Sequence, residues 1–337
     1  MTKTKSLVAL ALLLGVSVLV AGCGEKEDTI AAKQTRKMSL LLDYFPNADH
    51  AGIYAAQHGG HFEDAGLEVS IRQPTDPAAP IKQVAAGRTD LAVSYTPEVL
   101  RARDEGLKVV SVAALVREPL TSIISLPRAG IRSPRDLAGK TVGTAGIDYQ
   151  SAYLETILEE AGVDPRTVKE RNVGFSLSPA LLTGKVDAVL GAFWNYEGTE
   201  LRQKGRRPRI IRVDQAGVPP YDELVLVANE DALERDGKQI RAFIGALSRG
   251  TRDLAADPAK GIGALLEANR DLDPDLQRAV VKVTLPLFLP ERGKPFGYQD
   301  PREWAEFTQW ARENDIVRRI PDATGAFTND FLPGSGL

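Results

Sequence analysis

One stretch places a strand, a polar loop and a helix in immediate succession: Leu41-Leu42-Asp43-Tyr44-Phe45-Pro46-Asn47-Ala48-Asp49-His50-Ala51-Gly52-Ile53-Tyr54. The apolar run 38–42 is typical of a strand buried in a sheet. Pro46 cannot lie within a central strand, because proline has no backbone N–H to donate. Asn47 or Asp49 can cap the following helix, which Gly59-Gly60 ends. Open α/β sheets bind ligands where a strand runs into such a loop, so this is a candidate site, with an ordinary strand–loop–helix corner as the alternative.

The same alternation of strands and helices continues along the chain. Apolar, β-branched runs predict strands at 38–42, 67–72, 91–94, 109–116, 123–126, 141–144, 168–173, 188–192, 210–213 and 224–228. Helical patterns with short connections lie between most of them, which predicts mainly parallel sheets with helices on both faces. From Asp231 onward the pattern is mostly helical.

Turn-rich segments divide this pattern into two α/β lobes. The composition changes near Leu126 and again near Gly217, so we expect hinge segments at these two positions. The second lobe is then inserted into the first. Lobe I comprises residues 38–125 and 226–337, lobe II comprises residues 126–225, and a ligand is expected between them.

The N-terminus has the pattern of an export signal. Two lysines precede an apolar run at 7–20, which is short for a membrane span and suits a signal peptide. Val20-Ala21-Gly22-Cys23 then resembles the lipobox of bacterial lipoproteins, in which the cysteine is lipidated. We therefore expect a signal peptide at 1–22 and a lipidated, flexible tether at 23–37. The protein would be exported and lipid-anchored at the extracytoplasmic face of the cell membrane; a plain signal anchor is the alternative.

Composition limits the chemistry of the chain. Its 337 residues are 43% hydrophobic, enough to bury a core in one or two domains. A net charge of −3 and the lack of a long basic run argue against a nucleic-acid partner. Cys23 is the only cysteine, which excludes an internal disulfide, a cysteine metal cluster and a Cys-x-x-Cys pair.

No motif indicates a cofactor or a catalytic residue. His50, His58 and His61 fit no standard metal motif, and solvated helix-end positions are expected for them. The turn Gly143-Thr144-Ala145-Gly146 lacks the spacing of a nucleotide-binding loop. No pairing of a nucleophile with a base is visible. We expect no metal, no cofactor and no catalytic group.

The segment 191–197 ends a strand with aromatic, amide and carboxylate side chains in close succession: Gly191-Ala192-Phe193-Trp194-Asn195-Tyr196-Glu197. Strand alternation points Phe193 and Asn195 one way and Trp194 the other. Aromatic faces can stack on a flat heterocycle, and a carboxylate accepts from its amino group. The alternative is that the aromatic rings fill the core and Glu197 only favours the start of its helix.

Several motifs together resemble the periplasmic pyrimidine-precursor-binding proteins of thiamine biosynthesis. They are Asp43-Tyr44-Phe45-Pro46-Asn47, His50-Ala51-Gly52-Ile53-Tyr54, 85–95, 136–143, 172–175, 184–188, 193–197, 221–225 and 328–333. The resemblance covers nearly all of residues 38–333. The middle motifs are shared with the wider group of nitrate, sulfonate and taurine binders, whereas the first motif and Trp194-Asn195-x-Glu197 are more particular.

This resemblance implies a type II periplasmic-binding-protein fold, with two α/β lobes that are joined by a hinge and close on a ligand. The lobes would hand the ligand to the permease of an ABC transporter. The ligand-binding residues that it implies are Asp43, Tyr44, Asn47, His50, Tyr95, Trp194, Asn195, Glu197 and Tyr221. At position 44 many relatives have tryptophan, so the tyrosine keeps an aromatic face but changes its size and adds a hydroxyl.

The implied ligand is a thiamine pyrimidine precursor, such as hydroxymethylpyrimidine or a formylaminopyrimidine. Riboflavin, a sulfonate or another nitrogenous solute are alternatives within the same class of protein. Related eukaryotic enzymes make the pyrimidine on this fold with a cysteine-rich motif. That motif is absent here, because Cys23 belongs to the lipobox. We therefore expect a binding protein and not an enzyme.

Overall fold

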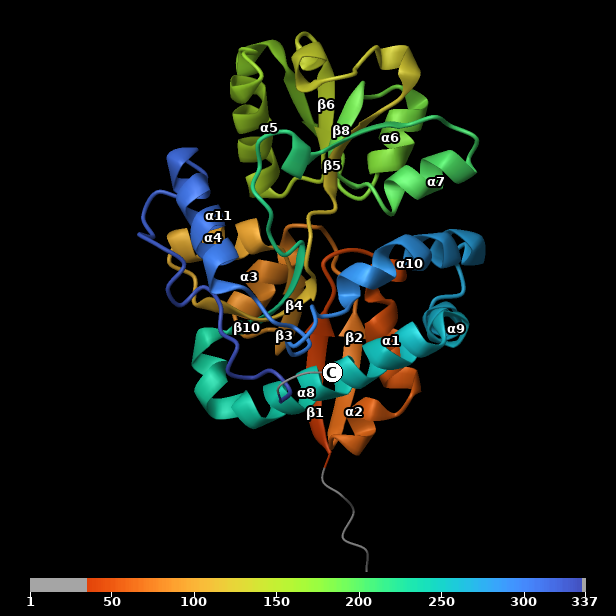
Figure 1. Ribbon diagram of the computed structural model, residues 1–337, viewed down its shortest axis with the longest axis vertical. Helices are drawn as coiled ribbons and strands as arrows, with labels where there is room; N and C mark the ends of the chain where they lie inside the picture. The colour runs from red at the N-terminus through yellow and green to blue at the C-terminus, as the bar shows by residue number, and fades with distance from the viewer. Residues whose placement is uncertain (1–34, 335–337) are drawn as a thin grey trace, which may run out of the picture. The chain divides into compact units, whose positions relative to one another are not determined.

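The computed structural model describes residues 35–334. The expected signal peptide, Cys23 and nearly all of the expected tether lie outside these residues. Within them, ten strands form two five-stranded sheets, and helices cover both faces of each sheet (Figure 1). The strands lie where the apolar, β-branched runs predict them, with bounds that differ by at most two residues. The predicted α/β fold is confirmed.

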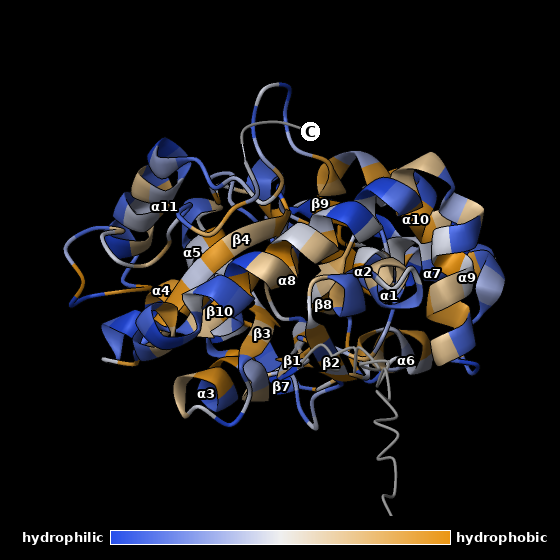
Figure 2. Ribbon diagram, turned by 90° about the horizontal axis from the view of Figure 1, so that it is seen from below, coloured by the Kyte–Doolittle hydropathy of each residue, from blue (hydrophilic) through white to orange (hydrophobic). Residues whose placement is uncertain are grey.

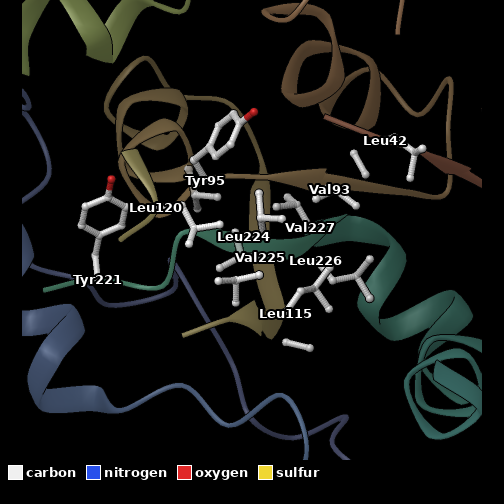
Figure 3. Packing of buried hydrophobic residues seen from close by; sticks show 14 of the residues in the cluster. Leu42, Val93, Tyr95, Leu115, Leu120, Tyr221, Leu224, Val225, Leu226 and Val227 are labelled. Atoms are coloured by element: carbon white, nitrogen blue, oxygen red, sulfur yellow. The ribbon is translucent and has the colours of Figure 1, made fainter. Parts of the chain in front are cut away.

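The first sheet carries the strand that enters the candidate loop. In spatial order its strands are β2 (Leu67–Arg72), β1 (Arg36–Leu41), β3 (Leu91–Ser94), β10 (Leu224–Asn229) and β4 (Val109–Val116). β1 is parallel to β2 and β3, whereas β10 is antiparallel to both of its neighbours. The first five residues of β10 are buried, as expected for a strand covered on both faces. Its side chains lie between those of Val93 and Leu115 (Figure 3).

The second sheet repeats this arrangement. In spatial order its strands are β7 (Lys169–Asn172), β6 (Thr141–Thr144), β8 (Ala188–Phe193), β5 (Thr121–Ser125) and β9 (Arg209–Arg212). β6 is parallel to β7 and β8, whereas β5 is antiparallel to β8 and β9. The strand expected at the end of lobe I is β5, and it pairs in this second sheet. In each sheet, the strand that the chain enters on crossing from the other sheet is antiparallel to its neighbours. This strand is β10 in the first sheet and β5 in the second.

Helices α1 and α8 lie on one face of the first sheet. The helices packed around this sheet are α1 (Ala51–His58), α2 (His61–Asp64), α3 (Ala79–Ala85), α4 (Thr96–Asp104), α8 (Glu230–Ala256), α9 (Pro258–Ala268), α10 (Pro274–Phe288) and α11 (Pro301–Glu313). Figure 2 shows α3 on the opposite side of the strands from α8, with the apolar residues of the strands between them. Of the residues described, no helix is long and apolar enough to cross a membrane.

Two glycines let α1 and α8 pack in close contact. A Cβ atom on Gly250 of α8 would lie 2.4 Å from the backbone nitrogen of Ala56 in α1. A Cβ atom on Gly52 of α1 would lie 2.6 Å from the hydroxyl of Thr251 in α8. Only glycine permits this approach at position 250, because the added atom would meet backbone, whereas at position 52 the Thr251 side chain would have to turn away. The contact fixes α1, and with it the loop that joins β1 to α1.

In the second lobe, helices also cover both faces of the sheet. They are α5 (Asp148–Glu160), α6 (Leu177–Thr183) and α7 (Glu197–Gln203). Figure 1 shows α5 on one side of β6 and β8, and α6 and α7 on the other. This arrangement places the start of α5 and the start of α7 at the end of the sheet that faces the first lobe.

The chain crosses between the sheets twice, at residues 117–120 and 213–223. The buried carboxylate of Glu223, in the second crossing, accepts hydrogen bonds from the backbone N–H groups of Leu120 (2.6 Å) and Thr121 (2.7 Å). It also accepts from the hydroxyls of Thr121 (2.8 Å) and Tyr221 (3.1 Å). One side chain thus ties the two crossings together. The first crossing precedes the composition change at Leu126, because β5 already belongs to the second sheet.

Candidate functional site

A cavity lies where the ends of the two sheets meet. From the first lobe it is lined by Asp43, Tyr44, Asn47, Asp49, His50, Tyr95 and Leu224. From the second it is lined by Ala145, Ile147, Tyr149, Gln150, Leu177, Gly191, Phe193, Tyr196 and Glu197. The space between the lining atoms is about 470 Å³, but the part wide enough for the centre of a water molecule is only about 20 Å³. The cavity is therefore narrow, and it sits at the strand ends where α/β sheets usually bind ligands.

Asp43 is held at the end of β1 by two donors from its own lobe. The Tyr95 hydroxyl donates to Oδ2 (2.7 Å), and Nε2 of His50 lies 2.8 Å from Oδ1. All three side chains are buried. Because an ionised carboxylate has about four acceptor positions, Asp43 can still accept from a ligand in the cavity.

The hydrogen bonds of His50 determine its tautomer. The backbone N–H of Asn47 donates to Nδ1 (3.2 Å), so Nδ1 is an acceptor and the proton lies on Nε2. Nε2–H then donates to Asp43. The expectation that His50 is a solvated helix-end histidine is wrong, because its ring is needed to orient Asp43 and to close the turn at Asn47. His61 does lie at a helix start, where Nε2 is 2.6 Å from a carboxylate oxygen of Asp253.

Tyr44 reaches across the cavity to the second lobe. Its hydroxyl donates to the backbone carbonyl of Phe175 (2.9 Å), and the two rings pack edge to face with centroids 4.7 Å apart. Burial raises the pKa of Tyr44 above its ordinary value, and the Glu197 carboxylate raises it further. The hydroxyl therefore stays protonated and keeps its role as a donor between the lobes.

Glu197 is the first residue of α7 and faces the cavity. The backbone N–H of Phe193 donates to its Oε2 (2.7 Å). Burial raises the pKa of Glu197 to about 8; hydrogen bonds from the backbone lower it, while Glu200 and Asp49 add to the increase. Near neutral pH the carboxyl of the empty site is largely protonated, and a donor in the cavity would favour its charged form.

Asn195 joins the lobes behind the cavity and does not line it. Its Nδ2 donates to Oδ1 of Asp49 (2.7 Å) and to the hydroxyl of Thr284 in α10 (2.7 Å). Asn195 is fully buried. Asp49 lies in the short helix η1 (Ala48–His50), and burial raises its pKa to about 7.

Two other residues predicted to bind the ligand also lie away from the cavity. The indole N–H of Trp194 donates to the carbonyl of Pro119 in the first crossing (3.1 Å), and the Arg212 guanidinium lies over its ring. Strand alternation has turned Trp194 to the side opposite Phe193, as expected. Tyr221 donates to Glu223 and packs on Phe307, apart from Tyr95 (Figure 3).

Carboxyl groups are the main charged groups among the lining residues. The lining includes three carboxyl groups, those of Asp43, Asp49 and Glu197, and neither lysine nor arginine. Four tyrosines and a phenylalanine supply aromatic surface: Tyr44, Tyr95, Tyr149, Tyr196 and Phe193. Across residues 35–334, no three His, Cys, Asp or Glu side chains are grouped so as to hold a metal ion. The cavity thus suits a small, flat ligand that carries hydrogen-bond donors.

Comparison with known proteins identifies the family of this chain. Residues 47–261 match the family described as NMT1/THI5 like. The chain belongs to this family. It is 35% identical over 329 residues to a formylaminopyrimidine-binding protein of Halalkalibacterium halodurans, which covers 96% of this chain and 99% of that one. It is 39% identical over 282 residues to a putative thiamine biosynthesis protein of Haemophilus influenzae, covering 83% and 89%.

More distant relatives of the chain are named as synthases. The 4-amino-5-hydroxymethyl-2-methylpyrimidine phosphate synthase THI13 of Saccharomyces cerevisiae is 25% identical over 308 residues, 88% of each chain. Solved structures show the fold. The alkanesulfonate-binding protein SsuA of Xanthomonas axonopodis pv. citri has a TM-score of 0.67 at 16% identity, covering 87% and 98%. A Candida albicans protein described as having the generic periplasmic binding protein fold has a TM-score of 0.63 at 15% identity, covering 90% and 98%. The predicted periplasmic-binding-protein fold is confirmed.

Several cavity residues of this NMT1/THI5-like protein were not predicted from its sequence. Gln150 is one: its Oε1 accepts from the backbone N–H of Ala145 (2.8 Å), which leaves its amide nitrogen close to Gly191. Gly191 has φ +92°, and a Cβ atom there would lie 2.2 Å from that nitrogen. A glycine in the middle of a predicted strand is the signal that a side chain approaches the backbone closely.

Proposed function

We propose that this chain is a solute-binding protein that captures a thiamine pyrimidine precursor of the formylaminopyrimidine or hydroxymethylpyrimidine type and delivers it to an ABC importer. The observation that carries the proposal is the cavity itself, which combines three carboxyl groups with aromatic faces and has no lysine or arginine in its lining. An aminopyrimidine is flat and presents amino donors, so it complements both features. The name of the Halalkalibacterium halodurans relative supports the same ligand class.

The acidic side chains that line the cavity argue against an anionic ligand. Two like charges 4 Å apart repel by about 4 kcal/mol at an effective dielectric constant of 20. A sulfonate in this cavity would lie beside the carboxyls of Asp43, Asp49 and Glu197, with no lysine or arginine in the lining to balance its charge. Its charge would oppose ionisation of these carboxyls, whereas a ligand with hydrogen-bond donors favours their charged forms. The similarity to the alkanesulfonate-binding protein extends to the fold only.

The small size of the cavity favours a single ring over riboflavin. About 20 Å³ is open to the centre of a water molecule, which is room for about one water, so the lobes must separate further for three fused rings and a sugar-like chain than for one substituted ring. Aromatic stacking on a single ring contributes about 1–3 kcal/mol. Tyr44 and Phe193 are aromatic lining residues from opposite lobes that can provide it.

Calorimetric titration of the purified protein tests this proposal. We expect binding of formylaminopyrimidine and of 4-amino-5-hydroxymethyl-2-methylpyrimidine, and at least about 100-fold weaker binding of riboflavin and of an alkanesulfonate, a difference of about 2.7 kcal/mol. Tighter binding of the sulfonate or of riboflavin would overturn the proposal.

The raised pKa values predict how pH affects binding. Glu197 has a pKa of about 8 and Asp49 of about 7 in the empty site. A ligand that donates to these groups favours their charged forms, so binding releases protons. Affinity should therefore rise between pH 6 and pH 8, by up to about tenfold per pH unit for each proton released, and level off above the pKa of Glu197. Calorimetry at pH 7 in two buffers with different ionisation enthalpies measures this release. Proton uptake, or affinity that falls over the same range, would contradict it.

The chain is expected to leave its ligand chemically unchanged. Its single cysteine, Cys23, lies in the lipobox, so the cysteine-rich motif associated with the related synthases is absent. The two relatives with the higher identities are not named as synthases. Mass spectrometry of formylaminopyrimidine after incubation with stoichiometric protein should recover it intact. A converted product would place the chain among the enzymes.

Membrane attachment through Cys23 follows from the order of basic, apolar and lipobox residues at the N-terminus. We propose that residues 1–22 are removed, that Cys23 is lipidated, and that residues 23–37 tether the protein beside the permease. Stable attachment requires more than one acyl chain, so Cys23→Ser should shift the protein from the membrane fraction to the soluble fraction or block its processing. Cell fractionation and immunoblotting test this, and unchanged membrane association of the variant would contradict it.

A further inference from the structure

The carboxyl group of Asp49 is only half satisfied. Oδ1 accepts from Asn195 at 2.7 Å, but Oδ2 is buried and has no hydrogen-bond partner. The side chain is 92% buried and forms part of the cavity wall. Buried acceptors nearly always have a donor, and leaving one without a donor is costly. The free oxygen therefore points to a donor that enters the cavity from outside the protein.

The satisfied oxygen of Asp49 links it to the other lobe. Asn195 lies between β8 and α7 of the second lobe, and its amide nitrogen also donates to Thr284 of α10, which packs beside η1. Asn195 therefore donates to two residues of the first lobe. This pair of hydrogen bonds exists only while the two lobes are close together.

We propose that Oδ2 of Asp49 accepts a hydrogen bond from the substituent side chain of a pyrimidine, either a hydroxymethyl O–H or a formamide N–H, while Oδ1 remains bonded to Asn195. The inference rests on the proposed function, because it takes a pyrimidine as the ligand. Glu197 faces the same cavity from the second lobe and receives the amino group of the ring. Two substituents of one ring are then recognised by carboxyl groups of opposite lobes.

This arrangement makes Asp49 a specificity-determining residue that also couples binding to closure. Its two oxygens are parts of one rigid group, so a ligand that fixes Oδ2 also fixes the orientation of Oδ1 toward Asn195. A ligand without the side-chain donor leaves Oδ2 unsatisfied in a buried position. Such a ligand should bind more weakly even where its ring fits.

The test compares two ligands on three proteins by calorimetry. The ligands are 4-amino-5-hydroxymethyl-2-methylpyrimidine and 4-amino-2,5-dimethylpyrimidine, which lacks the hydroxyl. The unaltered protein should bind the first about 10- to 100-fold more tightly, the range for a hydrogen bond to a charged group. In Asp49→Ala this preference should fall to about threefold or less. Asp222→Asn is the control, because Asp222 is also a buried aspartate, lies outside the cavity and accepts a hydrogen bond from Trp304; it should keep the preference.

Each outcome has a distinct meaning. A preference of about tenfold or more that persists in Asp49→Ala overturns the inference. If Asp49→Ala fails to fold, Asp49→Asn replaces it, since its amide oxygen can still accept from Asn195 while its NH₂ group cannot accept from the ligand. In that variant, the logarithm of the affinity ratio between the two ligands should fall to half of its original value or less. An unchanged ratio overturns the inference. If the unaltered protein binds neither of these pyrimidines nor formylaminopyrimidine, the proposed function itself fails.

The link to closure is tested with Asn195→Leu. This variant removes the donor to Oδ1 but leaves Asp49 in the cavity, so both ligands should bind more weakly while the preference for the hydroxymethyl compound remains. Small-angle scattering should show less compaction on ligand addition than in the unaltered protein. Unchanged affinity and unchanged compaction would show that Asp49 does not couple ligand binding to closure of the lobes.

Discussion

Glu223→Ala should lower the free energy of unfolding by about 3–5 kcal/mol, a large effect for a single substitution outside the cavity. Glu223 is fully buried and accepts from Leu120, Thr121 and Tyr221 in the crossing segments. Each buried donor left without an acceptor costs about 1–3 kcal/mol. Water entering the vacated space would satisfy part of this set, which keeps the total below the simple sum.

Urea unfolding of the empty protein measures this effect. Glu118→Ala is the control, because Glu118 lies in the same crossing region with its side chain about half exposed, paired with Arg212. Its effect should remain within about 0.5 kcal/mol. Glu223→Gln should fall between the two, since the amide keeps one acceptor oxygen. A loss below about 1 kcal/mol for Glu223→Ala would show that the crossings are held by other contacts.

The sequence predicted the strands well because their signal is local. The apolar run at 109–116 becomes β4 with all of its residues buried, and the run at 224–228 becomes β10. Runs of this kind are buried in any sheet they join. Their composition therefore predicts a strand without reference to the rest of the chain.

The assignment of β5 to a sheet was beyond local prediction. Residues 121–125 lie only four residues beyond β4 in sequence, which favours the first sheet. The strand instead pairs with β8 and β9 of the second. This choice depends on partners that lie far along the chain, and on Glu223, which fixes the crossing just before the strand.

The difference between local sequence signals and distant contacts also explains which site residues could be predicted. Tyr95 directly follows β3 and Asp43 lies two residues beyond β1, and the ends of parallel strands meet at one edge of a sheet. Asp49 and Gln150 lie at the starts of helices, where polar residues are common for local reasons. Trp194 was assigned to the site for its chemistry, but its direction depended on the pleat of β8 and on a contact with Pro119.

Glu197→Gln should reduce the affinity for an aminopyrimidine by about 1.5–3 kcal/mol, the range for a hydrogen bond to a charged group. In the empty protein, Oε2 accepts the backbone N–H of Phe193. The glutamine oxygen can take over that bond, which turns the amide NH₂ group toward the cavity. The amino group of the ligand would then meet a donor where it previously met an acceptor.

The unfolding midpoint of the empty protein separates this role from a purely structural one. If Glu197 only favours the start of α7, it contributes about 0.3–1 kcal/mol to stability and nothing to affinity. If it holds the ligand, Glu197→Gln leaves the midpoint of the empty protein almost unchanged, because the bond to Phe193 is retained. Glu200→Gln is the comparison variant: Glu200 lies one turn further along α7, pairs with Lys204 outside the cavity, and acts on the site only through its charge near Glu197. Calorimetry and thermal unfolding of both variants decide between the roles: unchanged affinity together with a lowered midpoint for Glu197→Gln would assign this carboxyl to the helix and remove it from the site.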